Sequence, residues 1–188
     1  MNRREILAWI SRSLATGVAG VIGIPGIRYL LGGSRSAEAG KTAFTRLVRF
    51  KDLQPGRPML VPVMGQAQDA WVRHDRHVVG RVWLVRQAGA ADPAAEGAVK
   101  VFSTICPHMG CQVNSQGGKG FLCPCHGANF GIEGNRQPDP QTGERNHAPR
   151  DLDHLDCRVV PEESTGDWWV EVKYEKFANG REDRVARA

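Results

Sequence analysis

Two short segments of the chain combine cysteine with histidine. The first reads Cys-Pro-His-Met-Gly-Cys and the second Cys-Pro-Cys-His-Gly. Together they supply six metal-binding side chains: Cys106, His108, Cys111, Cys123, Cys125 and His126. A single tetrahedral metal ion takes four ligands, so two donors are left over, and a disulfide between the segments would account for them in an exported protein. A structural zinc site is the alternative, but it gives the two additional cysteines no role.

The order Cys-x-His followed by Cys-x-x-His resembles the cluster region of Rieske iron-sulfur proteins, over residues 106–130. The resemblance implies a [2Fe-2S] cluster, with Cys106 and Cys123 on one iron and His108 and His126 on the other. It also implies a disulfide between Cys111 and Cys125. The glycines of the region, among them Gly110 and Gly127, would allow tight turns whose backbone amides approach the cluster.

The sequence departs from many high-potential members of that family at two positions. Those proteins have Ser directly after Cys-His-Gly and Tyr two residues further on, whereas this chain has Ala128 and Phe130. In the family these hydroxyls donate hydrogen bonds to sulfur atoms and so stabilise the reduced cluster. Their absence predicts a lower reduction potential, suited to menaquinol rather than ubiquinol.

The N-terminal residues have the pattern of an export signal and a membrane anchor. Arg3 and Arg4 precede an apolar run and resemble a twin-arginine signal. The uncharged stretch Ser13–Ile27 would form roughly 22 Å of helix, too short for a hydrocarbon core of about 30 Å. If Arg28 extends its charged group to the interface, the span reaches Gly33 and becomes long enough. The alternative is a cleaved signal peptide, since Ala-Glu-Ala at 37–39 offers a cleavage site.

After this anchor, expected over residues 1–33, a small and polar stretch predicts a flexible linker at 34–42. The remainder, 43–188, predicts one all-β Rieske domain, an antiparallel β-sandwich with a cluster-binding subdomain at about 104–150. Strands are expected at Phe44–Phe50, Met59–Val63, Val78–Val85, Val99–Ile105 and Trp168–Tyr174. The charged C-terminal residues, Ala178–Ala188, are expected to pack outside the core or to fray.

Several other residues receive structural interpretations. His74 and His77 are assigned to a solvated turn rather than to a metal site, and neither His147 nor His154 is expected to be a ligand. Cys157, the fifth cysteine, is expected as a small apolar residue of a strand. Consecutive tryptophans at 168 and 169 should point to opposite faces of their strand.

A downstream segment connects the resemblance with a respiratory complex. His-Ala-Pro-Arg at 147–150, followed by Asp-Leu-Asp-His-Leu at 151–155, resembles the proline loop that covers the cluster in Rieske subunits of cytochrome bc complexes. This resemblance adds Pro149 to the expected site. The resemblance implies a subunit that takes an electron from quinol beside a cytochrome b subunit and passes it to a c-type cytochrome. His108 and His126 would each keep a second ring nitrogen free to hydrogen-bond the quinol and to couple proton with electron transfer. The expected setting is a dimeric multi-subunit complex in a bacterial inner membrane, with the cluster domain on the outer side.

Other classes of function remain to be compared. The first alternative is the small Rieske subunit of a periplasmic molybdenum oxidoreductase such as arsenite oxidase. Soluble oxygenase ferredoxins fit less well, because they lack the membrane span and the two additional cysteines. Nucleic acid is not an expected partner, since the net charge of +5 comes from scattered lysines and arginines.

Overall fold

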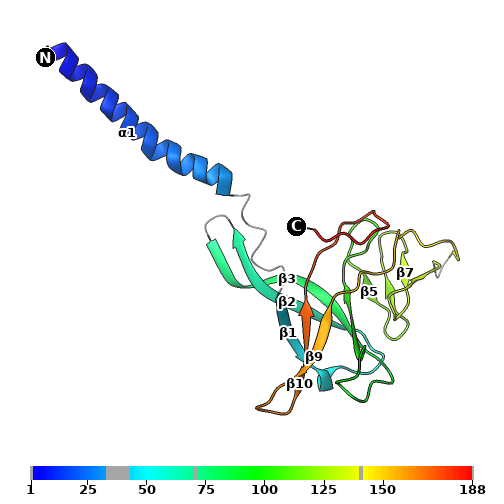
Figure 1. Ribbon diagram of the computed structural model, residues 1–188. Coiled ribbons are helices and arrows are strands. Elements are labelled where there is room, and N and C mark those ends of the chain that lie inside the picture. The colour runs from blue at the N-terminus through cyan, green and yellow to red at the C-terminus, as the bar shows by residue number, and fades with distance from the viewer. Residues whose placement is uncertain (1, 33–42, 70–71, 140–141, 188) are drawn as a thin grey trace.

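The computed structural model describes residues 2–32, 43–69, 72–139 and 142–187 (Figure 1). The expected linker at 34–42 lies outside these ranges. The described chain contains one long α-helix, one short 3-10 helix and ten β-strands.

Helix α1 (Arg3–Gly32) has 30 residues, including Pro25. At 1.5 Å per residue it extends for about 45 Å. Within Arg3–Leu30 an 18-residue window has a mean hydropathy of 1.4, and this window is not buried against other described residues. By length and composition α1 can therefore cross a membrane, as the sequence predicted.

Two antiparallel sheets form the larger part of the β domain. One has the order β1 (Phe44–Arg49), β10 (Trp168–Lys173), β9 (Cys157–Pro161), and the other β2 (Met59–Asp69), β3 (Val72–Arg86), β4 (Val99–Ser103). The 3-10 helix η1 (Phe50–Asp52) follows β1. Alternate residues of both sheets, such as Val82, Leu84, Val170 and Val172, meet in one buried core. This arrangement confirms the predicted all-β sandwich.

A third sheet consists of four two-residue strands, β5 (Asn114–Ser115), β6 (Phe121–Leu122), β7 (Asn129–Phe130) and β8 (Arg136–Gln137), paired antiparallel in that order. Phe121 and Phe130 belong to a second buried core, which also holds Trp83 and Phe102 of the neighbouring sheet. The sequence predicted loops here, because a two-residue strand is too short to show an alternating pattern. The first cysteine-histidine segment lies between β4 and β5, and the second lies between β6 and β7.

The interpretation of His74 and His77 as turn residues is wrong. Both lie on β3, which pairs with β2 well beyond the predicted strand ends, with His74 opposite Ala67 and His77 opposite Gly65. Their exposed side chains are polar, so no apolar alternation revealed the strand. Backbone pairing of this long hairpin determines the conformation instead.

The tryptophan pair shows the predicted alternation. Trp168 packs on the first core, whereas Trp169 donates a hydrogen bond to Glu162 and lies under the guanidinium groups of Arg46 and Arg49. Cys157 also lies where expected, on β9 against the first core, and its thiol contacts the Val99 carbonyl at 3.3 Å. Burial raises the pKa of this thiol to about 11, so it stays protonated.

Candidate metal centre

The two cysteine-histidine segments have the same backbone geometry. In the first loop (residues 106–111), the Gly110 amide donates to the Cys106 carbonyl at 3.0 Å and the Cys106 amide donates to the Cys111 carbonyl at 2.7 Å. In the second loop (residues 123–127), the Gly127 amide donates to the Cys123 carbonyl at 3.1 Å, and the Cys123 amide donates to the Ala128 carbonyl at 2.8 Å. Each loop is thus a closed turn that begins with a buried cysteine.

Glycine is required where each turn closes. Gly110 has φ +84° and Gly127 has φ +67°, in the left-handed region that other residues rarely adopt. A Cβ atom on Gly110 would also overlap the Asn179 side chain, and one on Gly127 would overlap the Asp139 carboxylate. Both glycines therefore have a conformational role at the site.

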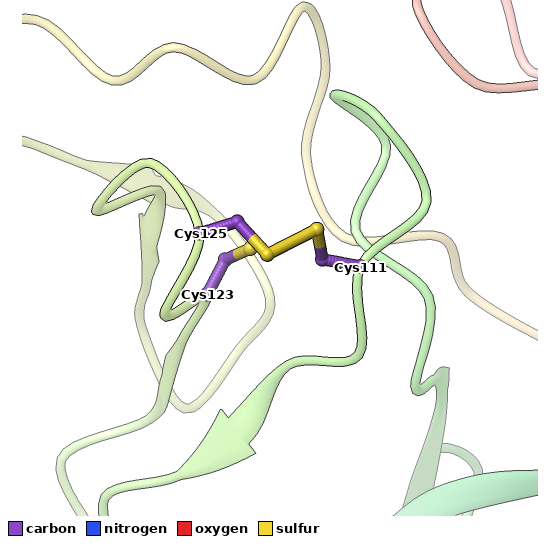
Figure 2. A group of neighbouring side chains, drawn as sticks. All are labelled: Cys111, Cys123 and Cys125. Atoms are coloured by element: carbon purple, nitrogen blue, oxygen red, sulfur yellow. A yellow bond between two sulfur atoms is a disulfide. The ribbon is translucent and has the colours of Figure 1, made fainter.

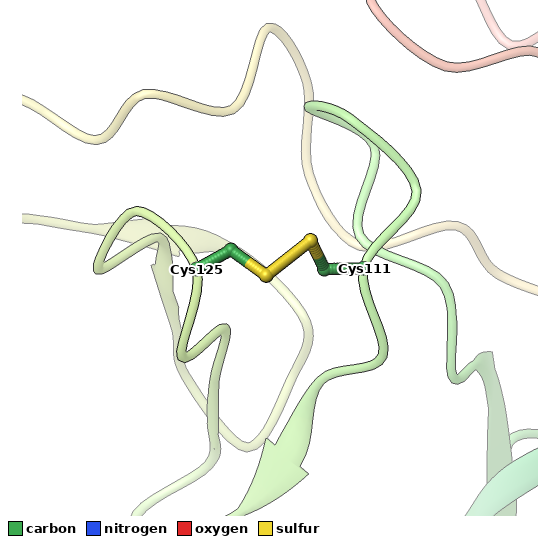
Figure 3. The surroundings of a disulfide bond; sticks show 2 residues. All are labelled: Cys111 and Cys125. Atoms are coloured by element: carbon green, nitrogen blue, oxygen red, sulfur yellow. A yellow bond between two sulfur atoms is a disulfide. The ribbon is translucent and has the colours of Figure 1, made fainter.

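A disulfide joins the two loops. Cys111 and Cys125 are bonded, with their Cα atoms 6.7 Å apart (Figure 3). The pairing implied by the Rieske resemblance is confirmed. The Cys123 sulfur points toward this bond, and the three sulfur atoms lie within 4.8 Å of one another (Figure 2). Because Cys111 and Cys125 are bonded to each other, Cys123 is the member of this group that can bind a metal.

The thiols of Cys106 and Cys123 lie together in the interior. They are 1% and 2% exposed, and the two thiols are close enough to interact electrostatically. Burial, with the neighbouring Cys123 as a smaller contribution, raises the pKa of Cys106 to about 12. Thiolates at this position need a cation as a neighbour, and a metal centre supplies one.

The two histidines of the loops also meet. The rings of His108 and His126 lie edge to face, with their centroids 4.8 Å apart. His108 Nδ1 is buried and has no hydrogen-bond partner among the described residues. An unsatisfied buried polar atom costs about 1–3 kcal/mol, so a ligand at this nitrogen would remove a real penalty. Paired buried thiols and an unpartnered imidazole nitrogen fit an iron-sulfur cluster.

A third segment, residues 146–150, covers the side of the first loop. The His147 ring stacks on the His108 ring with the centroids 6.2 Å apart. Asn146 donates to backbone carbonyls of β7 and β8, and Ala148 is 2% exposed in the second core. His147 was not expected to be a metal ligand, and its contact with the His108 ring was not predicted from the sequence. The resemblance of residues 147–150 to a proline loop was the available signal.

The remaining predicted site residues surround this centre. Ala128 and Phe130 are fully buried in the second core, which also contains Cys106 and Cys123. Pro149 is half-buried, and its carbonyl accepts a hydrogen bond from Arg136 at 2.9 Å. Arg3 and Arg4 begin helix α1, outside the centre.

An exposed apolar side chain lies in the first loop. Met109, between His108 and Gly110, is 67% exposed. Met109 directly follows His108 in the chain, and the His126 side chain is also exposed, so the first loop contributes an exposed apolar group next to one of the two histidines.

Two covalently joined loops that gather buried thiols and imidazoles on an antiparallel β domain define an iron-sulfur protein of the mixed cysteine and histidine type. A profile of the Rieske [2Fe-2S] domain matches residues 44–160, which is more than half of the chain. The chain therefore belongs to the Rieske [2Fe-2S] domain family, and its cofactor is a [2Fe-2S] cluster.

Similarity to individual proteins is lower. A chain of a hyperthermophilic respiratory Complex III is 19% identical, with a TM-score of 0.41, and the match covers 83% of this chain and 98% of that one. The quaternary ammonium Rieske monooxygenase CntA is 18% identical, with a TM-score of 0.39 and 77% of this chain covered. The terminal oxygenase of carbazole 1,9a-dioxygenase from Novosphingobium sp. KA1 is 15% identical, with a TM-score of 0.40 and 89% covered.

The present chain spans 33% of the CntA chain and 38% of the dioxygenase chain. A search of curated protein sequences found no match. Similarities of this size do not bear on what the chain acts on or assembles with.

Proposed function

We propose that Cys106 and Cys123 bind one iron of the cluster and that His108 and His126 bind the other. The observation that supports this ligand set most directly is the buried His108 Nδ1 atom without a partner, beside two buried thiols. The cluster, when bound, supplies a one-electron carrier. Gly110 and Gly127 allow the tight turns of the two ligand-bearing loops, and the disulfide holds these loops at a fixed distance from each other.

The ligand set is tested by substitution. His108→Ala and His126→Ala in the full chain should each abolish the cluster, measured as iron content and as the paramagnetic signal of the reduced protein. His147→Ala is the matched control, because its ring also lies beside His108 but is not assigned as a ligand. Retention of the full signal in His108→Ala or His126→Ala would contradict the assignment.

We further propose that the chain is the membrane-anchored Rieske subunit of a bc-type quinol:cytochrome c oxidoreductase. Its support is the presence, on one chain, of a Rieske domain and a helix long and apolar enough to cross a membrane. The exposed His126 ring can donate a hydrogen bond to a quinol oxygen, and exposed Met109 offers an apolar contact for the quinol ring. The electron would then pass to a c-type cytochrome.

In this proposal residues 1–33 form the anchor, 34–42 the linker and 43–188 the electron-carrying head. The head lies on the outer side of a bacterial inner membrane, after export directed by Arg3 and Arg4. Menaquinol is the proposed donor, because Ala128 and Phe130 bring no hydroxyl to the interior around Cys106 and Cys123.

Purification of the native complex from membranes tests the assembly. A cytochrome b subunit that co-purifies with the chain is the expected result. Co-purification with a molybdopterin-containing subunit instead would support the alternative, a subunit of a periplasmic molybdenum oxidoreductase, and would overturn the bc-type assignment.

A further inference from the structure

The C-terminal segment lies against the first loop. Residues 178–187, named here the C-terminal strap, run beside the cluster region in red in Figure 1. The Gly180 amide donates to the Pro107 carbonyl at 2.8 Å. The Asn179 side chain occupies the space that a Cβ on Gly110 would need. The sequence predicted a segment packed outside the core or frayed, and the strap does pack outside it, on the loop that carries His108.

The strap does not hold itself in place by burying apolar groups. Every residue from 180 to 187 is exposed. The strap folds back on itself, since the Ala178 amide donates to the Val185 carbonyl at 2.8 Å, and Phe177 just before it reaches the first core. Its position over the loop therefore depends on polar contacts.

Arg150 makes the central polar contacts. Its guanidinium is bonded to both carboxylate oxygens of Asp153, at 2.7 and 2.8 Å. It also donates to two strap carbonyls, that of Arg181 at 2.6 Å and that of Ala178 at 2.8 Å. Arg150 is 8% exposed and Asp153 4%. A buried guanidinium with all of these acceptors is rigid, because every lost contact would leave a desolvated group.

The same pair is connected to the sheet. The Asp153 carbonyl accepts a hydrogen bond from the Ser103 amide, at the end of β4, at 2.8 Å. A continuous set of contacts thus runs from β4 through Asp153 and Arg150 to the strap, and from the strap to Pro107 and Gly110. The last two residues flank His108 and Met109 in the first loop.

We propose that Arg150 is a positioning residue for the cluster: through the C-terminal strap it fixes the first loop, and so the orientation of His108. This inference rests on the proposed ligand role of His108. Arg150 contacts neither thiol nor imidazole of the centre, so its effect passes through the Gly180 and Asn179 contacts.

The first test measures amide hydrogen exchange in the full chain in detergent, with and without its cluster. Asn179→Ala removes one strap contact without disturbing a buried charge. The double substitution Arg150→Met with Asp153→Leu removes the strap anchor while replacing a buried ion pair by apolar groups, which folded proteins tolerate. In both variants the amides of residues 108–111 should exchange about tenfold faster, with residues 124–127 unchanged.

Arg181→Ala is the matched control, since it shortens an exposed strap side chain and keeps the carbonyl that Arg150 binds. The amides of the first loop in Arg181→Ala should exchange at the same rate as in the unmodified chain. Equal exchange of the first loop in all variants would overturn the proposal. Faster exchange of both loops and of β4 together would also overturn it, because the strap would then be a general stabiliser.

The second readout is the paramagnetic spectrum of the reduced cluster. Loosening of the first loop should broaden the spectrum in Asn179→Ala and in the double variant, but not in Arg181→Ala. A faster-exchanging loop with an unaltered spectrum would refute the positioning role while leaving the ligand assignment intact. Absence of any cluster signal from the unmodified chain would instead refute the proposed function, and the exchange result would stand separately.

Discussion

The side chains of Ala128 and Phe130 share the second core with Cys106 and Cys123. Both are fully buried, so a hydroxyl introduced at either position would be withdrawn from water and close to the sulfur-bearing residues. Such a hydroxyl needs an acceptor, and electron-rich sulfur is one. The electrostatics of the proposed cluster can therefore be changed at these two positions without altering a ligand.

Ala128→Ser and Phe130→Tyr should each raise the midpoint potential, because a donor to sulfur stabilises the reduced state. The expected rise is on the order of 59 mV, which is a tenfold change in the equilibrium constant for one electron. Redox titration followed by the spectrum of the reduced cluster measures it.

Ala98→Ser and Phe50→Tyr are matched controls, since both residues are buried in the first core. The midpoint potentials of these two variants should equal that of the unmodified chain. If neither Ala128→Ser nor Phe130→Tyr raises the potential, the explanation of a low-potential centre is wrong.

Most residues of the metal centre could be predicted from the sequence, because the Cys-x-His and Cys-x-x-His spacings are local. The positions of His147 and of the C-terminal strap were not predictable in the same way. Each contacts the first loop only through the tertiary fold, and the proline-loop resemblance around His147 indicated a segment near the cluster but not the ring contact with His108.

Among the structural elements, the two loops depend on each other through the disulfide. The bridge closes a loop with a sequence separation of 14 residues, and a constraint of this size stabilises a fold by about 3 kcal/mol. Cys111→Ala with Cys125→Ala should lower the free energy of unfolding by about that amount and accelerate loss of iron. Denaturant titration and the decay of the cluster absorption measure the two effects.

Cys157→Ala is the control for this experiment, because its thiol packs against the first core on β9, away from the loops. It should leave the rate of iron loss unchanged. Equal rates of iron loss in the double variant and in Cys157→Ala would show that the disulfide does not stabilise the metal centre.

A second prediction concerns the contact between the proline-loop segment and β4. The His154 ring packs edge-on against Phe102, at 4.5 Å between centroids. Burial lowers the pKa of His154, and the charges of Lys100 and Arg184 lower it further, against a smaller opposing effect of Asp156. The unfolded chain therefore binds this proton more readily than the folded chain.

As the pH falls through 6.5, the ordinary pKa of histidine, the unfolded chain takes up a proton at His154 before the folded chain does. The free energy of unfolding must therefore decrease. His154→Gln should accordingly show a smaller decrease in melting temperature between about pH 7.5 and about pH 5.5 than the unmodified chain. His74→Gln, at an exposed position of β3, is the control and should retain the full decrease. A full decrease in His154→Gln would contradict the prediction.

The elements differed in how well the sequence predicted them. Val99–Ser103 and Trp168–Lys173 were predictable because apolar and β-branched residues dominate them. Strands β5 to β8 were not, since two residues carry no period. The outer part of the β2–β3 hairpin was missed for another reason: its backbone continues the pairing, while its sequence shows no alternation of apolar and polar residues.

For the whole molecule, the position of Arg3 and Arg4 at the first turn of α1 leads to a prediction about export. Substituting both by Lys keeps the charge but should block the twin-arginine route, so that the cluster-bearing head stays inside the cell. Protease added to spheroplasts should then leave the head intact, whereas it should degrade the head of the unmodified chain.

Arg12→Lys, further along the same helix, is the matched control and should be exported normally. Export of the Arg3→Lys, Arg4→Lys variant at the normal level would rule out these residues as the signal. The helix itself was predictable from hydropathy, because an 18-residue window within Arg3–Leu30 has a mean hydropathy of 1.4.

The crowding of Cys111, Cys123 and Cys125 within 4.8 Å also restricts the order in which the protein can mature. A free Cys123 thiolate can attack the neighbouring disulfide, forming a new bond to one sulfur and releasing the other as a thiolate. If Cys123 binds iron as proposed, iron loading before oxidation would prevent this shuffling, because the Cys123 sulfur would already be bound to the metal. Air oxidation of the iron-free chain should therefore yield a mixture of cysteine pairings in peptide mapping, and the iron-loaded chain should yield one.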